Sequence, residues 1–201
     1  MIVAFAVPPS LPLAPARRAG RGLAWALAAW AFAYACYRAY YAAGGTVGLF
    51  GEPVSVAQFR AVNAVGAGII LAAAVVPPVT VRVRRAHRVL PGVAWLVAVG
   101  CCAHAVVNGA LRILSLAGAH PTVLPADVWR WYDRRTSDLQ DLLMNEPWFL
   151  VEGLLWAALG LVFVAPARRR AWVSAAVAVC LVASVAGVLS GIGVIGSVRI
   201  G

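Results

Sequence analysis

Long apolar runs alternate with short polar segments along the chain, and this pattern predicts about five membrane-spanning helices. Each run has the length of about 20 residues that an α-helix needs to cross the hydrocarbon core of a bilayer. The predicted spans cover about residues 23–43, 56–79, 92–116, 138–164 and 172–195. We therefore predict an all-α integral membrane bundle that forms one domain, residues 23–196. It follows a Pro- and Arg-rich cytoplasmic tail, residues 1–22.

The fourth predicted span carries two boundary signals. Residues 137–140 (SDLQ) match a capping box, so the helix is expected to begin there. Pro147 is expected to kink the helix, or to break it so that the span is only residues 147–164.

A short helix lying on the bilayer surface is expected before this span, where Trp129, Trp131 and Tyr132 occur. In the fifth span, small residues spaced by four are typical of close helix packing: Ala183, Gly187 and Gly191.

The arginines predict how the bundle is oriented. All 17 basic residues are arginine, and the net charge is +10. They cluster in the tail, in the loop after the second span and in the loop after the fourth span. Because positively charged loops stay in the cytoplasm, the N-terminus is predicted inside and the C-terminus outside. Membrane topology thus explains the basic composition without nucleic acid, and we expect a multi-pass plasma-membrane protein with lipids as partners.

The composition supports this class and excludes several kinds of chemistry. The chain is 63% hydrophobic with a mean hydropathy of +0.86, whereas soluble proteins are about half apolar. Its four cysteines form no C-x-x-C pair, and it has no Gly-rich phosphate loop and no serine-nucleophile elbow. Histidine spacings typical of metal sites are missing, and the nearby arginines would oppose a cation. We therefore expect neither a metal nor a cofactor, and the oligomeric state is left open.

Polar residues within the predicted spans fall in the outer half of the membrane once this topology is applied. A charged residue at the bilayer centre costs about 2.5–3.5 kcal/mol, so several of them are expected to be paired or used. Four helices contribute these residues: Arg38, Arg60, Asn63, His104, Asn108, Arg112, Asp138, Asp141, Asn145, Glu146 and Glu152. We expect an outward-opening cavity that they line, with aromatic walls formed by Trp148, Trp156, Tyr37 and Tyr41.

Helical spacing groups some of these residues. His104, Asn108 and Arg112 occur at intervals of four and form one stripe. On an unbroken fourth helix, one face would carry Asp138, Asp141, Asn145, Trp148 and Glu152. Glu146 would point about a third of a turn away, unless Pro147 reorients it. The expected counter-charges are Arg38, Arg60 and Arg112.

Three segments of the chain have a distinctive sequence: Ala39–Leu49 (AYYAAGGTVGL), Phe59–Gly68 (FRAVNAVGAG) and Asn145–Gly160 (NEPWFLVEGLLWAALG). Together they resemble a family of small multi-span membrane proteins of actinobacteria. Recurring features of that family are Y-W-x-x-G-G-T-x-G-L and E-P-W-F-L-x-x-G. The resemblance covers the first, second and fourth spans and implies a membrane bundle but no activity. Arg38 and Glu152 depart from the family pattern.

A second resemblance, of architecture and acidic residues rather than of a motif, is to bacterial membrane-bound terpene cyclases of indole-sesquiterpene (drimentine-type) pathways. It implies proton-initiated cyclisation of a hydrophobic prenylated substrate that enters from the lipid. Such chemistry needs a buried acid that keeps its proton, aromatic faces for the carbocation and the exclusion of water. Glu152, the deepest acid, is the first candidate, followed by Glu146 and Asp141. The predicted substrate-binding residues are Trp148, Trp156, Tyr37, Tyr41, Arg38, Arg112, His104, Asn108 and Asn63.

Two non-catalytic alternatives remain open from the sequence. The arginines of the outer cavity would also suit an anionic lipid headgroup, a partner protein or the role of an accessory transporter subunit. Arginine–carboxylate pairs would equally serve to hold the bundle together without any ligand.

Overall fold

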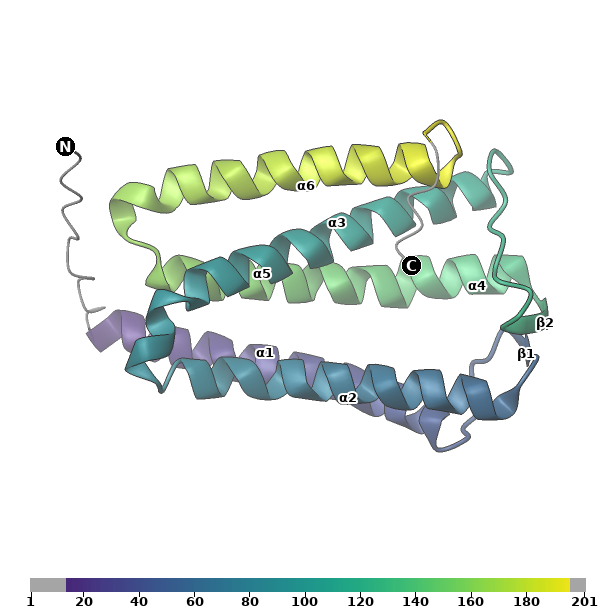
Figure 1. Ribbon diagram of the computed structural model, residues 1–201, viewed down its shortest axis with the longest axis horizontal. Coiled ribbons are helices and arrows are strands. Elements are labelled where there is room, and N and C mark those ends of the chain that lie inside the picture. The colour runs from purple at the N-terminus through teal and green to yellow at the C-terminus, as the bar shows by residue number, and fades with distance from the viewer. Residues whose placement is uncertain (1–13, 196–201) are drawn as a thin grey trace, which may run out of the picture.

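The protein folds as an elongated bundle of long helices that run roughly side by side, as the computed structural model in Figure 1 shows. Residues 14–195 are described, except for the side chains of residues 14–17 and of Arg84. The helices are α1 (Ala14–Ala42), α2 (Val56–Thr80), α3 (Leu90–Leu116), α4 (Arg134–Gln140), α5 (Glu146–Phe163) and α6 (Arg169–Gly191). Two short strands, β1 (Gly51–Pro53) and β2 (Trp129–Tyr132), form a small antiparallel ribbon.

Four helical stretches of the described chain are long and apolar enough to cross a membrane. They are Val56–Thr80, Leu90–Leu116, Arg134–Phe163 and Pro166–Gly191. The predicted number was about five. Helix α1 has 29 residues, but its tryptophans, tyrosines and arginines lower its hydropathy, and it is not among the four.

Helix α1 begins earlier than predicted. It starts at Ala14 rather than near residue 23, so Arg17, Arg18 and Arg21 lie in the helix and not in a tail. Alanine and arginine favour a helix, and Pro15 is tolerated in its first turn, where no N–H partner is needed. The predicted tail up to residue 13, and residue 196 of the predicted bundle, lie outside the described residues.

The fourth helix begins at Arg134 and is capped by Asp133, not by the predicted capping box. Asp133 Oδ1 accepts a hydrogen bond from the Thr136 N–H at 3.2 Å, and Oδ2 accepts one from the Thr136 hydroxyl at 2.9 Å. These bonds favour the charged carboxylate and hold the pKa of Asp133 below its ordinary value. The helix therefore gains a turn, and both Ser137 and Asp138 are buried within it.

Pro147 does not break this helix. A π-helical turn over Asp141–Asn145 joins α4 to α5, and the Glu146 N–H donates to the carbonyl of Asp141. Proline has no N–H and its ring crowds the carbonyl one turn before it, so a wider turn accommodates Pro147. The wide turn interrupts the face predicted for an unbroken helix, so that Asp141 faces α3 whereas Trp148 faces α1.

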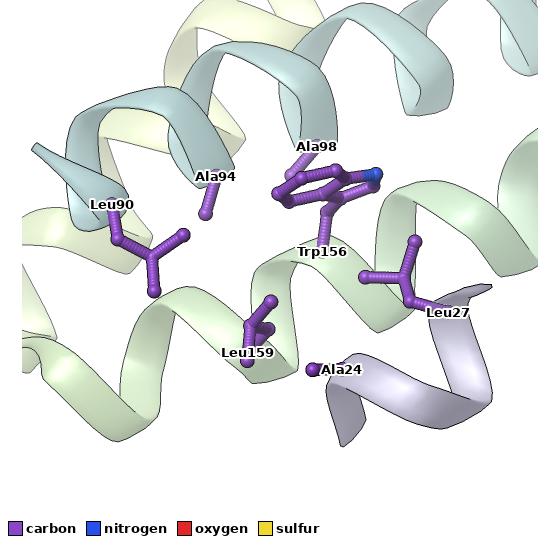
Figure 2. Packing of buried hydrophobic residues seen from close by; sticks show 7 residues of the cluster. All are labelled: Ala24, Leu27, Leu90, Ala94, Ala98, Trp156 and Leu159. Atoms are coloured by element: carbon purple, nitrogen blue, oxygen red, sulfur yellow. The ribbon is translucent and has the colours of Figure 1, made fainter. Parts of the chain in front are cut away.

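The long helices pack in the order α2, α1, α5, α3, α6. Helix α1 contacts α2 and α5, and α3 contacts α5 and α6. Figure 2 shows the apolar core where three of them meet. Its residues are Ala24, Leu27, Leu90, Ala94, Ala98, Trp156 and Leu159. On α6, Gly187 and Gly191 contact Val107 and Leu111 of α3, which confirms the predicted close packing of small residues.

Gly153 sets the separation of α3 and α5. A Cβ atom placed there would lie 2.7 Å from Cys102 Sγ and 3.1 Å from the carbonyl oxygen of Ala98. Gly153→Ala is therefore expected to lower the free energy of unfolding by about 1–3 kcal/mol, as overpacking does. Unfolding in mixed detergent micelles measures this. Gly100→Ala is the control, because a Cβ there meets nothing within 4 Å, and equal stability of the two variants would contradict the packing argument.

The β-ribbon lies at the end of the bundle where α1 and α3 end and where α2 and α4 begin (Figure 1), which we call the ribbon end. It pairs the loop after α1 with the loop after α3, and Arg130 Nη1 contacts Glu52 Oε1 across it at 2.5 Å. A surface helix was predicted for the second of these loops. The aromatic residues of β2 instead pair as an extended strand, a conformation that aromatic side chains favour.

Candidate functional site

Arg112 of α3 is the centre of a polar cluster near the ribbon end. Its Nε donates to Asp141 Oδ2 at 2.8 Å and its Nη1 donates to Thr122 Oγ1 at 2.9 Å. The same Nη1 lies 3.7 Å from Asp138 Oδ1. Of the three arginines expected as counter-charges, Arg112 is the one that pairs with acids of the fourth helix.

Asp138 is buried with only 1% of its surface exposed, and both of its carboxylate oxygens are satisfied. The Ser115 hydroxyl donates to Oδ2 at 2.5 Å, and the Thr122 hydroxyl donates to Oδ1 at 2.7 Å. Ser115 also accepts from the Thr122 N–H at 2.9 Å, which ties the loop after α3 to the helix. Sequence reasoning missed both hydroxyls, although Ser115 follows Arg112 by three residues and shares its helix face.

Asp141 is held in the same cluster. In addition to Arg112, the Asn145 side-chain amide donates to its Oδ1 at 2.6 Å. The Tyr34 hydroxyl of α1 donates to Asn145 Oδ1 at 3.2 Å, so the chain of bonds links α1, α3 and the π turn. Both oxygens of Asp141 accept hydrogen bonds from within the protein, so its geometry suits a structural role better than the predicted role of acid.

Glu146 differs from both aspartates. It is 7% exposed, and its Oε2 has no hydrogen-bond partner among residues 14–195. The nearest basic group is His104 Nε2, which is 3.8 Å away, beyond hydrogen-bond range. Asn108 Nδ2 lies 3.1 Å from this same Nε2, and the Phe149 ring packs edge-on against the imidazole with its centroid at 4.5 Å. The structure therefore brings four residues together: Glu146, His104, Asn108 and Phe149.

His104 connects this buried carboxyl group to the surface of the bundle. Its side chain is 49% exposed, while the Glu146 side chain beneath it is 8% exposed. Ordinarily a buried carboxyl oxygen has at least one partner. The unpartnered oxygen of Glu146 therefore lies beside a half-exposed histidine.

Glu152 is buried as well, but it lies among different neighbours. It forms no ion pair within residues 14–195. One turn further along α5, Trp156 is 2% exposed and packs in the apolar core of Figure 2. Its indole Nε1 has no hydrogen-bond partner in the described chain. Trp156 is therefore a core residue and not the cavity wall that was predicted.

The other predicted aromatic walls form a ladder between α1 and its neighbours. Trp148 stacks on Trp30 with centroids 4.0 Å apart and on Tyr34 at 5.4 Å. Tyr37 accepts a hydrogen bond from Gln140 Nε2 at 3.0 Å, and Tyr41 donates to the carbonyl of Val47 at 3.0 Å. These contacts explain how α1 is attached to the fourth helix and to the loop that follows α1.

Arg38, Arg60 and Asn63 form a separate group between α1 and α2. Arg60 Nε donates to the carbonyl of Ala42 at 2.9 Å, at the end of α1 where helix carbonyls lack partners. The buried Asn63 donates to the carbonyl of Phe59 at 2.8 Å. Arg38 makes no ion pair and no side-chain hydrogen bond within residues 14–195. The expectation that Arg38 and Arg60 balance the acids of the fourth helix is therefore wrong.

Clefts of the described structure lie at the ribbon end, and neither of the two described below joins the acids of the fourth helix to Arg38, Arg60 or Arg112. The first has a volume of about 370 Å³ and is lined by Ser115, Leu116, Arg134, Arg135, Asp138 and Leu139. The second has a volume of about 200 Å³ and is lined by Arg38, Ser55, Gln58, Phe59, Val62, Asn63, Val128 and Trp129. Neither of these clefts is lined by Glu146 or Glu152. No group of three or more metal-ligating side chains occurs in the described residues.

Comparison of the chain with family models, with curated proteins and with solved structures finds no match. The inference of function therefore rests on the residues and their geometry.

Proposed function

We propose that the chain is a plasma-membrane protein that crosses the bilayer five times, with α1 as a span beside the four more apolar ones. Helix α1 packs against both α2 and α5, so it crosses wherever they cross. The end opposite the ribbon carries the start of α1, the loop after α2 and the loop after α5 (Figure 1), which hold most of the arginines. Because such loops stay in the cytoplasm, the ribbon end faces outward.

Site-directed labelling tests this topology. In the chain with its four cysteines replaced by alanine, Val47→Cys in the exposed loop after α1 is expected to react with a membrane-impermeant maleimide in intact cells. Arg85→Cys at the opposite end is expected to react only after the cells are lysed. The reverse pattern would contradict the proposed orientation.

We further propose that the protein is a cyclase that uses Glu146 to start ring closure of a hydrophobic prenylated substrate. The observation that carries this proposal is the buried carboxyl oxygen of Glu146, which lacks a partner beneath the half-exposed His104. A carboxyl group without donors in a site with little water keeps its proton, and that proton is what an alkene needs to become a carbocation. This assigns to Glu146 the role that the sequence gave first to Glu152.

The residues around Glu146 supply the other requirements of the reaction. The carboxyl proton would add to a terminal alkene carbon, and the π electrons of the next alkene would attack the cation and close a ring. The final cation would lose a proton to His104, which would return it to the Glu146 carboxylate, so that product and substrate are isomers. Phe149 and Tyr34 offer aromatic faces that stabilise a cation near the acid.

The position of His104 supports entry of an apolar substrate from the side. With α3 in the bilayer, the exposed half of the imidazole meets lipid and not water, so a prenyl chain would reach Glu146 without crossing an aqueous phase. Membranes that carry the full chain, given a farnesylated aromatic, would then form a product of unchanged mass, and the Glu146→Gln variant would not. Chromatography with mass detection measures this product.

The cluster around Arg112 supports a structural role beside this site. Each carboxylate oxygen of Asp138 and Asp141 accepts a hydrogen bond from an arginine, hydroxyl or amide donor of the protein itself. We assign them to the attachment of α3, of the loop that follows it and of the fourth helix to one another.

A further inference from the structure

Arg38 is an arginine without a counter-charge inside a helical bundle. It lies one turn before the end of α1, is partly buried, and has no carboxylate partner among residues 14–195. Its guanidinium lies against the backbone of α2 at Gly66, where a Cβ atom would be 3.2 Å from both Nε and Nη2. Any larger residue at this position would press on the guanidinium. Long basic side chains near a helix end ordinarily extend to water, but this one is partly buried against α2.

The cleft beside Arg38 is lined mostly by apolar side chains, but several of its groups can bind an anion. It extends to Ser55, which caps the N-terminus of α2, and to the exposed side-chain amide of Gln58. The Ser55 oxygen accepts from the Gln58 N–H, which leaves its hydroxyl hydrogen free to donate. Arginine, a hydroxyl, an amide and the positive end of a helix dipole all favour a negatively charged group. No acidic side chain lines the cleft.

The size and the surroundings of the cleft indicate what the anion belongs to. Its volume of about 200 Å³ is below the roughly 300–1,000 Å³ of pockets that enclose a drug-sized ligand. It therefore holds a small head group and leaves any attached chains outside. On α2, the residues that follow the cleft along the helix expose an apolar strip of Val62, Val65 and Ile69, which are more than half exposed. Trp129 at the rim is of the type that lies at headgroup level in membranes.

We propose that this cleft binds the phosphodiester headgroup of an anionic phospholipid of the outer leaflet. The phosphate lies against Arg38, Ser55 and Gln58, and the acyl chains follow Val62, Val65 and Ile69 toward the middle of the membrane. The site is independent of the Glu146 chemistry, because the two share no residue. The phosphate supplies the missing counter-charge of Arg38.

Binding of phosphatidylglycerol to the full-length, delipidated protein in detergent, followed by native mass spectrometry, tests the proposal. Arg38→Gln is expected to weaken binding about tenfold, which is the loss of one charge-assisted hydrogen bond. Gly66→Val keeps every charge but displaces the guanidinium, and it is expected to weaken binding as well. Arg60→Gln, which removes an arginine outside the cleft, and phosphatidylcholine, which has no net charge, are the controls.

Three outcomes would overturn this assignment. Equal binding by wild type and Arg38→Gln would show that the cleft holds no headgroup. An equal loss in Arg60→Gln would show attraction to surface charge only. Competition by inorganic phosphate at the same concentration as the lipid would show that the site takes the free ion and makes no use of the apolar strip on α2.

Discussion

Glu146→Gln is expected to lower the turnover of a farnesylated aromatic by about 10²–10⁴-fold, the range that a positioned acid contributes. The substitution keeps the size and the shape of the side chain but removes the acidic proton. Because Oε2 makes no hydrogen bond in the described structure, no existing contact is lost, and the protein is expected to remain folded. Product formation by membranes with equal amounts of each variant measures the effect.

Two other glutamates make this result specific. Glu52→Gln changes an exposed acid in the β-ribbon, which pairs with Arg130, and full turnover is expected. Glu152→Gln is expected to retain most of the turnover, because no histidine of the described residues lies within 4 Å of the Glu152 carboxylate to return a proton to it. Full activity of Glu146→Gln would exclude Glu146 as the acid. Loss of activity in Glu152→Gln alone would instead identify Glu152, the first candidate from the sequence, as the acid.

Arg112→Met is expected to destabilise the fold by about 3–5 kcal/mol, the cost of leaving a buried charge without its partner. Its side chain is 17% exposed, and its guanidinium donates to Asp141 and Thr122 and lies 3.7 Å from Asp138. Methionine fills a similar volume but leaves both aspartates without a cation. The free energy of unfolding in mixed detergent micelles is the measurement.

A second arginine gives the matched control. Arg130→Met breaks an exposed pair with Glu52, for which about 0–1 kcal/mol is expected. Combining Arg112→Met with Asp141→Asn removes one of the two carboxylate charges that have lost their cation. The double variant is therefore expected to recover part of the lost free energy of unfolding. If Arg112→Met were no less stable than Arg130→Met, the cluster would not hold the helices together.

The apolar pattern predicted α2 and α3 almost to the residue, because their boundaries coincide with proline, glycine and loop signals. It placed the fourth helix four residues late, since two capping patterns compete there. Asp133 with Thr136 and Ser137 with Gln140 both match a cap, and only the tertiary contacts of Ser115 with Asp138 favour the first. The β-ribbon was not predicted, because it joins two loops that are far apart in the sequence.

The candidate site was predicted as a region but not as a set of contacts. The depth of each residue in its predicted span placed Arg112, Asp138 and Asp141 at a similar depth in the membrane, and in the structure they lie together. The π turn before Pro147, however, changed which residues face one another. The spacing of a regular α-helix, on which the prediction was based, does not account for such a turn. Uncharged partners such as Thr122 were missed, because a loop hydroxyl becomes a ligand of Asp138 only through the fold.

The ribbon joins two segments of the chain that are synthesised at different times. Glu52 and Arg130, which meet across it, are 78 positions apart. At the usual rate of translation, β1 emerges on the order of ten seconds before its partner strand. The hairpin of α1 and α2 must therefore be inserted first and wait with one strand edge open. Pairing of β1 with β2 then joins the α1–α2 hairpin to the helices synthesised after it, at the ribbon end, where the Arg112 cluster also forms.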